Sequence, residues 1–177
     1  SIIVADHPDK RHYVQLTEKA FVGIDPESGD VLWRRDWNGR TAVIPTPIYH
    51  DRKVYVTSGY GVASELVDIS DLNNPERVWF SQTMKNHHGG VILLDGHFYG
   101  YSDGVGWVCQ SMEDGEAVWR EKEELAKGAI GYADGRVYLL DESNGDVALI
   151  SATAEGWQEN GRFRLTPQTE RRKPRGR

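Results

Sequence analysis

The sequence predicts an all-β protein of about four repeated units, each a four-stranded antiparallel sheet. Two markers recur along the chain and support this. The first is a turn and an apolar run ending in a ring, at Trp33, Trp79, Trp119 and Phe163, with steps of 46, 40 and 44 residues. The second is a tyrosine after a turn, at Tyr13, Tyr55, Tyr99 and Tyr138, with steps of 42, 44 and 39 residues. Four short strands per period are typical of a β-propeller blade.

The turn at residues 25–29 shows the design of the unit. Pro26 fixes φ and Gly29 supplies a positive φ, so two apolar runs are joined tightly. The same design returns at residues 112–119, again with a glycine four residues before the tryptophan. A less similar copy at residues 74–79 has Pro75 in place of glycine. Residues 160–163 form a degenerate copy in which phenylalanine replaces tryptophan.

The blades are expected at about residues 1–37, 41–83, 86–122 and 128–166. Turn residues bound each strand, as in the hairpin signal Asp95-Gly96. The expected strands are 2–5, 12–17, 20–25 and 31–35; 46–49, 53–57, 65–69 and 77–81; 91–94, 98–102, 107–111 and 117–121; and 129–132, 137–140, 147–152 and 161–165. Residues 121–127 are expected to form one helical turn.

Length, composition and charge limit the classes of protein to which this chain can belong. A chain of 177 residues can bury one core, and it contains no apolar stretch long enough to span a membrane. The net charge is −6. The end of the tail at 167–177, residues 171–177, carries five of the 21 basic residues and no acidic one, so the rest of the chain carries −11. An acidic body argues against a nucleic-acid partner. We expect the tail to be a disordered terminus or to lead into a missing blade.

The pattern Asp-x-x-(x)-Gly-x-x-x-Trp resembles the tryptophan-docking blade of quinoproteins, the propellers similar to pyrroloquinoline quinone (PQQ) dehydrogenases, over about residues 1–166. The same blade occurs in dehydrogenases that bind PQQ and in propellers that bind none, such as the lipoprotein of the outer-membrane β-barrel assembly machinery. The run from residues 13–17 through 86–90 to 106–110 resembles bacterial PQQ-like repeat proteins labelled polyvinyl-alcohol dehydrogenases. The resemblance implies a periplasmic or extracytoplasmic location.

Relatives of this kind have eight blades, so the resemblance implies half of an eight-bladed quinoprotein-like ring. An open half-ring leaves two sheet faces uncovered, and uncovered apolar faces associate. The chain is therefore expected to be a fragment of a larger propeller or to pair head-to-tail as a homodimer.

Propeller topology places two sets of connections on one face around the central channel, where ligands bind because several loops converge. One set joins consecutive blades, and the other joins the second and third strands of a blade. The candidate residues in the first set are Thr46, Asn86, His87, His88 and Lys127. Those in the second set are Glu18, Lys19, Tyr60, Asp103, Trp107 and Asn144.

His87 and His88 are the sharpest local signal. Histidines can be acid/base groups or metal ligands, but neighbours on a strand point to opposite sides and form a poor chelate, so no metal site is predicted. The adjacent Gly89 and Gly90 allow close approach of a ligand or of another strand. The alternative is that both histidines only hold the junction between blades.

Trp107 is the candidate quinone contact. Family enzymes hold PQQ between a tryptophan and a ring formed by two adjacent disulfide-bonded cysteines, whereas Cys109 is the single cysteine of this chain. The alternative is that Trp107 and Cys109 pack between blades, as Trp33, Trp79 and Trp119 are expected to do. The family enzymes also need calcium and an aspartate as general base, for which Asp103 is the candidate although no calcium motif surrounds it.

The sequence thus predicts a propeller that binds a small molecule or peptide on its channel face without a membrane span. The candidate binding residues are Trp107, Tyr60, Asn86, His87, His88, Lys127 and Thr46, and the candidate catalytic residues are Asp103, His87 and His88. The alternative is a PQQ-dependent alcohol dehydrogenase of the polyvinyl-alcohol type, an oxidoreductase that would use PQQ with calcium.

Overall fold

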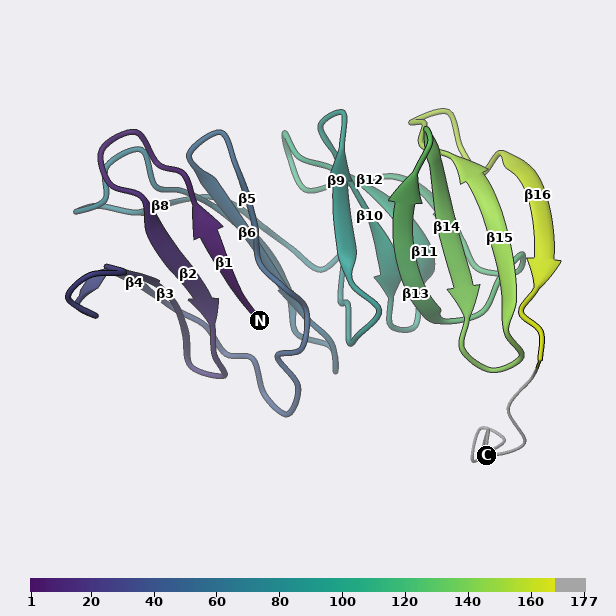
Figure 1. The fold of residues 1–177 in the computed structure, drawn as a ribbon, viewed down its shortest axis with the longest axis horizontal. Helices are drawn as coiled ribbons and strands as arrows, with labels where there is room; N and C mark the ends of the chain where they lie inside the picture. The colour runs from purple at the N-terminus through teal and green to yellow at the C-terminus, as the bar shows by residue number, and fades with distance from the viewer. Residues whose placement is uncertain (168–177) are drawn as a thin grey trace.

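The computed structural model describes residues 1–167, so the basic tail lies outside the described residues except for Pro167. The described residues form sixteen strands in four separate four-stranded antiparallel sheets, each with its strands in chain order. Figure 1 shows the sheets arranged along the molecule as an open series, with β4 near one end and β16 at the other. The expected all-β segment of four propeller blades is confirmed.

The strands lie within two residues of their expected ranges. Blade one contains β1 (Ile2–Ala5), β2 (His12–Leu16), β3 (Ala20–Ile24) and β4 (Val31–Asp36). Blade two contains β5 (Ile48–His50), β6 (Lys53–Ser58), β7 (Ala63–Asp68) and β8 (Glu76–Ser81). Blade three contains β9 (Val91–Leu94), β10 (His97–Ser102), β11 (Gly106–Ser111) and β12 (Ala117–Glu121). Blade four contains β13 (Gly128–Ala133), β14 (Arg136–Asp141), β15 (Asp146–Ser151) and β16 (Glu159–Arg164).

Three apolar clusters fill the three spaces between consecutive blades. The first joins blades one and two around Phe21, Trp37 and Val56. The second joins blades two and three around Tyr55 and Phe98, whose rings stack with centroids 3.9 Å apart. The third joins blades three and four around Trp107 and Leu139. Since burial of apolar area is the main favourable term in folding, the core of this protein lies between its sheets.

A bulge recurs at the same place in every blade and corrects both sequence markers. The third and fourth strands shift register once, directly after Gly23, Leu66, Cys109 and Leu149. The fourth-strand partners of these residues are Trp33, Trp79, Trp119 and Gly161. Gly161, not Phe163, therefore holds the tryptophan position in blade four. The second-strand partner in blade one is Val14, not Tyr13, which faces the opposite side of the sheet.

Two tryptophans dock onto the next blade, as expected from the sequence. Trp79 is 8% exposed, and its indole donates a hydrogen bond to the Met112 carbonyl at 2.9 Å. Its ring covers Gly115, where a Cβ atom would lie 2.7 Å from the indole. Trp119 donates to the Thr153 carbonyl at 2.8 Å. Each indole thus satisfies its donor on the turn between the third and fourth strands of the following blade.

Trp33 is buried as expected, but it bonds within its own blade. Its indole donates to Nε2 of His12 at 2.9 Å, and its ring lies over Gly23. The reason is local, because Gly23 lacks a side chain and leaves room for the ring beside β3. Trp33 still contributes to the cluster between blades one and two.

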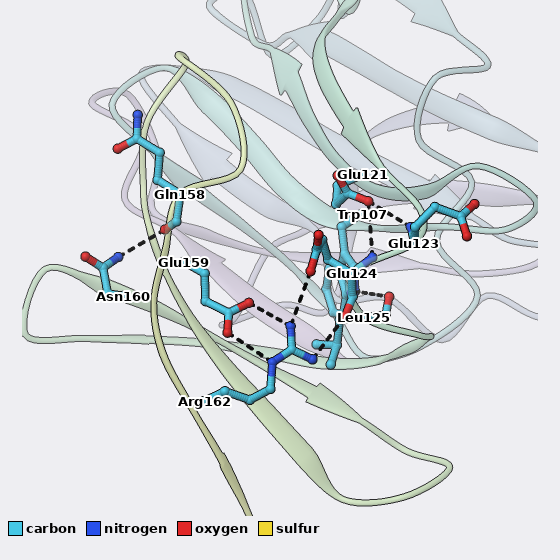
Figure 2. Close-up of polar contacts among 9 residues, drawn as sticks. All are labelled: Trp107, Glu121, Glu123, Glu124, Leu125, Gln158, Glu159, Asn160 and Arg162. Carbon is cyan, nitrogen blue, oxygen red and sulfur yellow. Dashed lines mark hydrogen bonds and ion pairs between the residues drawn. The ribbon is translucent and has the colours of Figure 1, made fainter.

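The helical turn expected at residues 121–127 is wrong, and the described residues contain no helix, hence none that could span a membrane. Side-chain donors from other parts of the chain bind backbone carbonyls of this segment, which would accept hydrogen bonds within the helix if a helical turn formed. The Leu125 carbonyl accepts from the Trp107 indole at 3.0 Å, and the Glu124 carbonyl accepts from Arg162 at 3.0 Å. Figure 2 shows these contacts on the segment, with Arg162 also paired to Glu159.

Candidate functional site

Within the described residues, seven connections between strands, from β2–β3 to β14–β15, lie on one face of the molecule. Each of them contacts a neighbouring connection. The chain of contacts begins in blade one, where the amides of Trp37 and Gly39 donate to carbonyls of the β2–β3 turn. Trp37 also donates from its indole to Ser58 at 3.0 Å, at the end of β6. Arg40 donates to the Tyr60 carbonyl at 3.4 Å. Connections from blades one and two are therefore held side by side.

The His87 side chain is the centre of the next part of this face. Its ring lies against the Tyr60 ring, with centroids 4.6 Å apart, and Nδ1 lies 3.1 Å from the ammonium nitrogen of Lys127. Lys127 also binds the Asp103 carboxylate at 2.6 Å. These four residues come from the β6–β7, β8–β9, β10–β11 and β12–β13 connections, so three blades supply them. We call Tyr60, His87, Asp103 and Lys127 the channel-face cluster.

The protonation of His87 follows from its partner. An ammonium group can only donate, so Nδ1 of His87 accepts and the neutral ring carries its proton on Nε2. Burial lowers the pKa of His87, and the nearby Lys127 charge lowers it further. The cluster therefore presents a neutral imidazole beside a paired cation at neutral pH.

His88 extends the cluster toward blade four. Its Nε2 lies 3.4 Å from a Glu142 carboxylate oxygen, and the Glu142 amide donates to the Lys127 carbonyl at 3.1 Å. Glu142 was missed at the sequence level. The same rule that selected Asp103 would have found it, because both follow the second strand of their blade.

Close backbone approaches position the two histidines. A Cβ atom on Gly59 would lie 2.6 Å from both Cα and Cβ of His87, so only glycine lets the two connections touch. Gly89 has φ +91° and lies directly against the Gly128 carbonyl. Of the two glycines that follow the histidines, Gly89 thus allows the backbone to come close to another strand, β13.

Asn86 directly precedes His87 on the β8–β9 connection and is fully buried. Its amide nitrogen donates to the carbonyls of Gly90 at 3.1 Å and Tyr101 at 2.9 Å. Its side-chain oxygen has no hydrogen-bond partner among the described residues. Asn86 therefore ties the β8–β9 connection to blade three.

Trp107 lies in the core rather than on the channel face. It is 1% exposed, packs edge-to-face on Tyr101, and joins the cluster between blades three and four. Cys109 is fully buried too, and burial raises the pKa of its thiol to about 11. Both residues occupy the packed position that was the alternative interpretation of the sequence.

The other candidates lie away from the channel-face cluster. Thr46 is exposed between two prolines. Glu18 and Lys19 contribute backbone carbonyls to the face, and Asn144 binds Asp146. Within residues 1–167 no group of three or more histidine, cysteine, aspartate or glutamate side chains could hold a metal ion.

Two cavities of the described part lie away from this cluster. One of about 500 Å³ lies between blades two and three and includes Leu66, Val78 and Met112 in its lining. Another of about 430 Å³ lies at the outer strands of blades one and two. The channel-face cluster is thus singled out by converging side chains, not by its volume.

Comparison with solved structures gives the same fold. BamB from Moraxella catarrhalis aligns with a TM-score of 0.65 at 16% identity, covering 86% of this chain and 45% of that one. A computationally designed protein aligns at 0.61 with 10% identity, covering 92% and 58%. A quinohemoprotein alcohol dehydrogenase from Pseudomonas putida aligns at 0.52 with 20% identity, covering 71% and 21%. The chain therefore spans less than two thirds of each of these proteins.

No curated protein sequence matches the chain. Residues 17–162 match the family model described as outer membrane protein assembly factor BamB. That match spans more than half of the chain and agrees with the sixteen-stranded architecture. The protein therefore belongs to this family of PQQ-like β-propeller repeats.

Proposed function

We propose that this protein is a binding propeller that holds its ligand at the channel-face cluster. The observation that carries the proposal is the contact network around His87, to which connections of three blades each contribute a polar or aromatic side chain. Polar groups that converge from separate loops are typical of ligand sites in propellers.

The donors of the cluster indicate the chemistry of the ligand. Lys127 has three N–H groups and binds two protein acceptors, Asp103 and His87. His87 adds its Nε2–H, and Tyr60 offers a ring that is 50% exposed. A ligand with a carboxylate next to an aromatic or apolar group satisfies these donors and packs on the ring, as a small acid or an acidic peptide would.

The alternative of a PQQ-dependent alcohol dehydrogenase does not fit the residues of this chain. Trp107, the candidate to stack on the quinone, has both faces covered by the core. Cys109 is the single cysteine of the sequence, so this chain does not supply the two adjacent cysteines of that ring. Neither half of the quinone-holding arrangement implied by the resemblance is available here.

Titration with phenylacetate, which combines a carboxylate and a ring, tests the proposal. The imidazole NMR signals of His87 should shift saturably. Lys127→Met should weaken binding about tenfold through loss of a charged hydrogen bond. Tyr60→Asn, which suits the positive φ of 55° at this position, should weaken it about threefold through loss of the ring contact.

Tyr132→Asn is the matched control, because Tyr132 is an equally exposed tyrosine (51%) near the turn at the opposite end of blade four. It should leave the affinity unchanged. Equal weakening by Tyr60→Asn and Tyr132→Asn, or no His87 shift in the folded protein, would contradict the proposed site.

A further inference from the structure

A second polar site lies at the outer strands of blades one and two. A cavity of about 430 Å³ is lined by Arg34, Arg35 and Asp36 of β4 and by Arg77 of β8. We call these four residues the arginine pocket. It lies on different elements from the channel-face cluster, so it does not depend on the function proposed above.

A buried carboxylate holds two of these arginines in place. Glu65 on β7 is 1% exposed, and its two oxygens accept from Arg35 and Arg77, each at 3.1 Å. Arg35 also donates to the Pro75 carbonyl at 3.2 Å. Glu65 therefore fixes two guanidinium groups from neighbouring blades beside the same cavity.

The charges of the site leave a positive excess. Three guanidinium groups face two carboxylates, since Asp36 pairs with Arg34 at 3.0 Å and Glu65 is shared by the other two. Arginine remains protonated at every ordinary pH. The arginine pocket and Glu65, five residues in all, thus have a net charge of +1.

Several donors in the pocket remain free among the described residues. Arg34 binds Asp36 through Nη2 alone, and Arg77 binds Glu65 through Nη2 alone. The Nε and Nη1 groups of both have no acceptor within residues 1–167. Both side chains are about half exposed, at 54% and 51%, so a solute can reach them. The planar fork of arginine matches the spacing of oxyanion oxygens.

We propose that the arginine pocket binds a phosphate group. A carboxylate offers two oxygens, whereas a phosphate offers at least three and satisfies more of the free Nε and Nη1 donors. The group can be inorganic phosphate or part of a phosphorylated small molecule, and both have the same chemistry at the pocket.

The test is a titration of the folded protein with inorganic phosphate at constant ionic strength, followed by the NMR signals of the arginine Nε–H groups. Parallel titrations use acetate and glycerol 3-phosphate. Phosphate and glycerol 3-phosphate should shift the Arg34 and Arg77 signals saturably, and acetate should bind more weakly. Selective binding of glycerol 3-phosphate would identify a phosphorylated small molecule as the source, whereas equal binding would identify the phosphate group itself.

Arg34→Gln should weaken phosphate binding about tenfold, the effect of one charge-assisted hydrogen bond. Arg77→Gln should act similarly, but it also leaves Glu65 with one partner and can lower stability. Among residues 1–167 the Arg34 guanidinium is paired with the exposed Asp36 and with no buried group, so Arg34→Gln should leave the fold intact. Arg120→Gln is the matched control, since Arg120 follows Trp119 as Arg34 follows Trp33 and lines a cavity with no second arginine.

The proposal predicts that Arg120→Gln leaves the phosphate affinity unchanged. Equal losses for Arg34→Gln and Arg120→Gln would indicate general surface charge and overturn it. Unchanged affinity in Arg34→Gln, or acetate binding as tightly as phosphate, would also overturn it.

Discussion

His12 is fully buried, and both of its ring nitrogens are engaged. The indole of Trp33 can only donate, so Nε2 of His12 accepts and Nδ1–H donates to the Lys10 carbonyl at 2.7 Å. Burial lowers the pKa of His12 below its ordinary value. The neutral tautomer is thus part of the fold of blade one, because a proton on Nε2 would break the bond to Trp33.

The depressed pKa of His12 makes stability depend on pH. The unfolded chain binds the proton more readily, so this contribution is complete above about pH 6.5 and is lost as the pH falls below that value. His87, whose pKa is also lowered, adds to the loss in the same direction. NMR titration should place the pKa of His12 below 6.5, and a value at or above 6.5 would show that the bond from Trp33 is absent in solution.

Gly115 should be the most sensitive glycine of the turns between third and fourth strands. It has φ +76°, and a Cβ atom there would meet the Trp79 ring at 2.7 Å. Gly115→Ala should lower the free energy of unfolding by about 3 kcal/mol, from backbone strain plus overpacking. Gly29→Ala is the control, since Gly29 has φ +79° with nothing within 4 Å and should cost about 1 kcal/mol. Equal costs in urea unfolding would mean that Trp79 does not dock on this turn.

At the scale of the element, the sequence predicted the strands well because each blade alternates apolar runs with strong turn signals. The exact register could not be read in this way. The pairing of β15 with β16 puts Gly161 at the tryptophan position, whereas spacing alone selected Phe163. Similarly, Trp107 and Cys109 fall on one side of β11, but only packing against blade four shows that this side is buried.

The channel-face cluster was more predictable, because strand alternation fixes the end of each blade on which a connection lies. Tyr60, His87, Asp103 and Lys127 were selected by this topology, and they are in contact in the structure. Topology does not determine how far a side chain reaches. Thr46 also lies on a connection at this end of the blades, but it remains exposed between two prolines.

The contact between blades one and two depends on Glu65. Its carboxylate is buried and held by arginines from both blades. Glu65→Gln should lower the free energy of unfolding by about 3 kcal/mol, because it leaves the partly buried Arg35 without its counter-charge. Asp6→Asn removes an exposed pair with Arg11 and should cost little. Similar losses for the two variants in urea unfolding would contradict a structural role for the buried carboxylate.

For the whole molecule, the two end sheets leave apolar faces uncovered. Blade one exposes Ile2, Val4, Tyr13 and Val31. Blade four exposes Tyr132 and Phe163, and it has glycine where the other blades have their tryptophan. Faces of this kind favour association. We therefore expect this chain to dimerise in solution, and light scattering that shows a monodisperse monomer at micromolar concentration would contradict this expectation.

We propose that the chain binds its ligand at the channel-face cluster and does not hold a quinone against Trp107. The most direct measurement is a PQQ titration with calcium present, followed by tryptophan fluorescence, beside the phenylacetate titration of the same sample. We expect no saturable quenching by PQQ at micromolar concentration and a saturable shift of the His87 signals by phenylacetate. Saturable quenching that is lost when calcium is chelated would contradict it and would make a quinoprotein dehydrogenase the better interpretation.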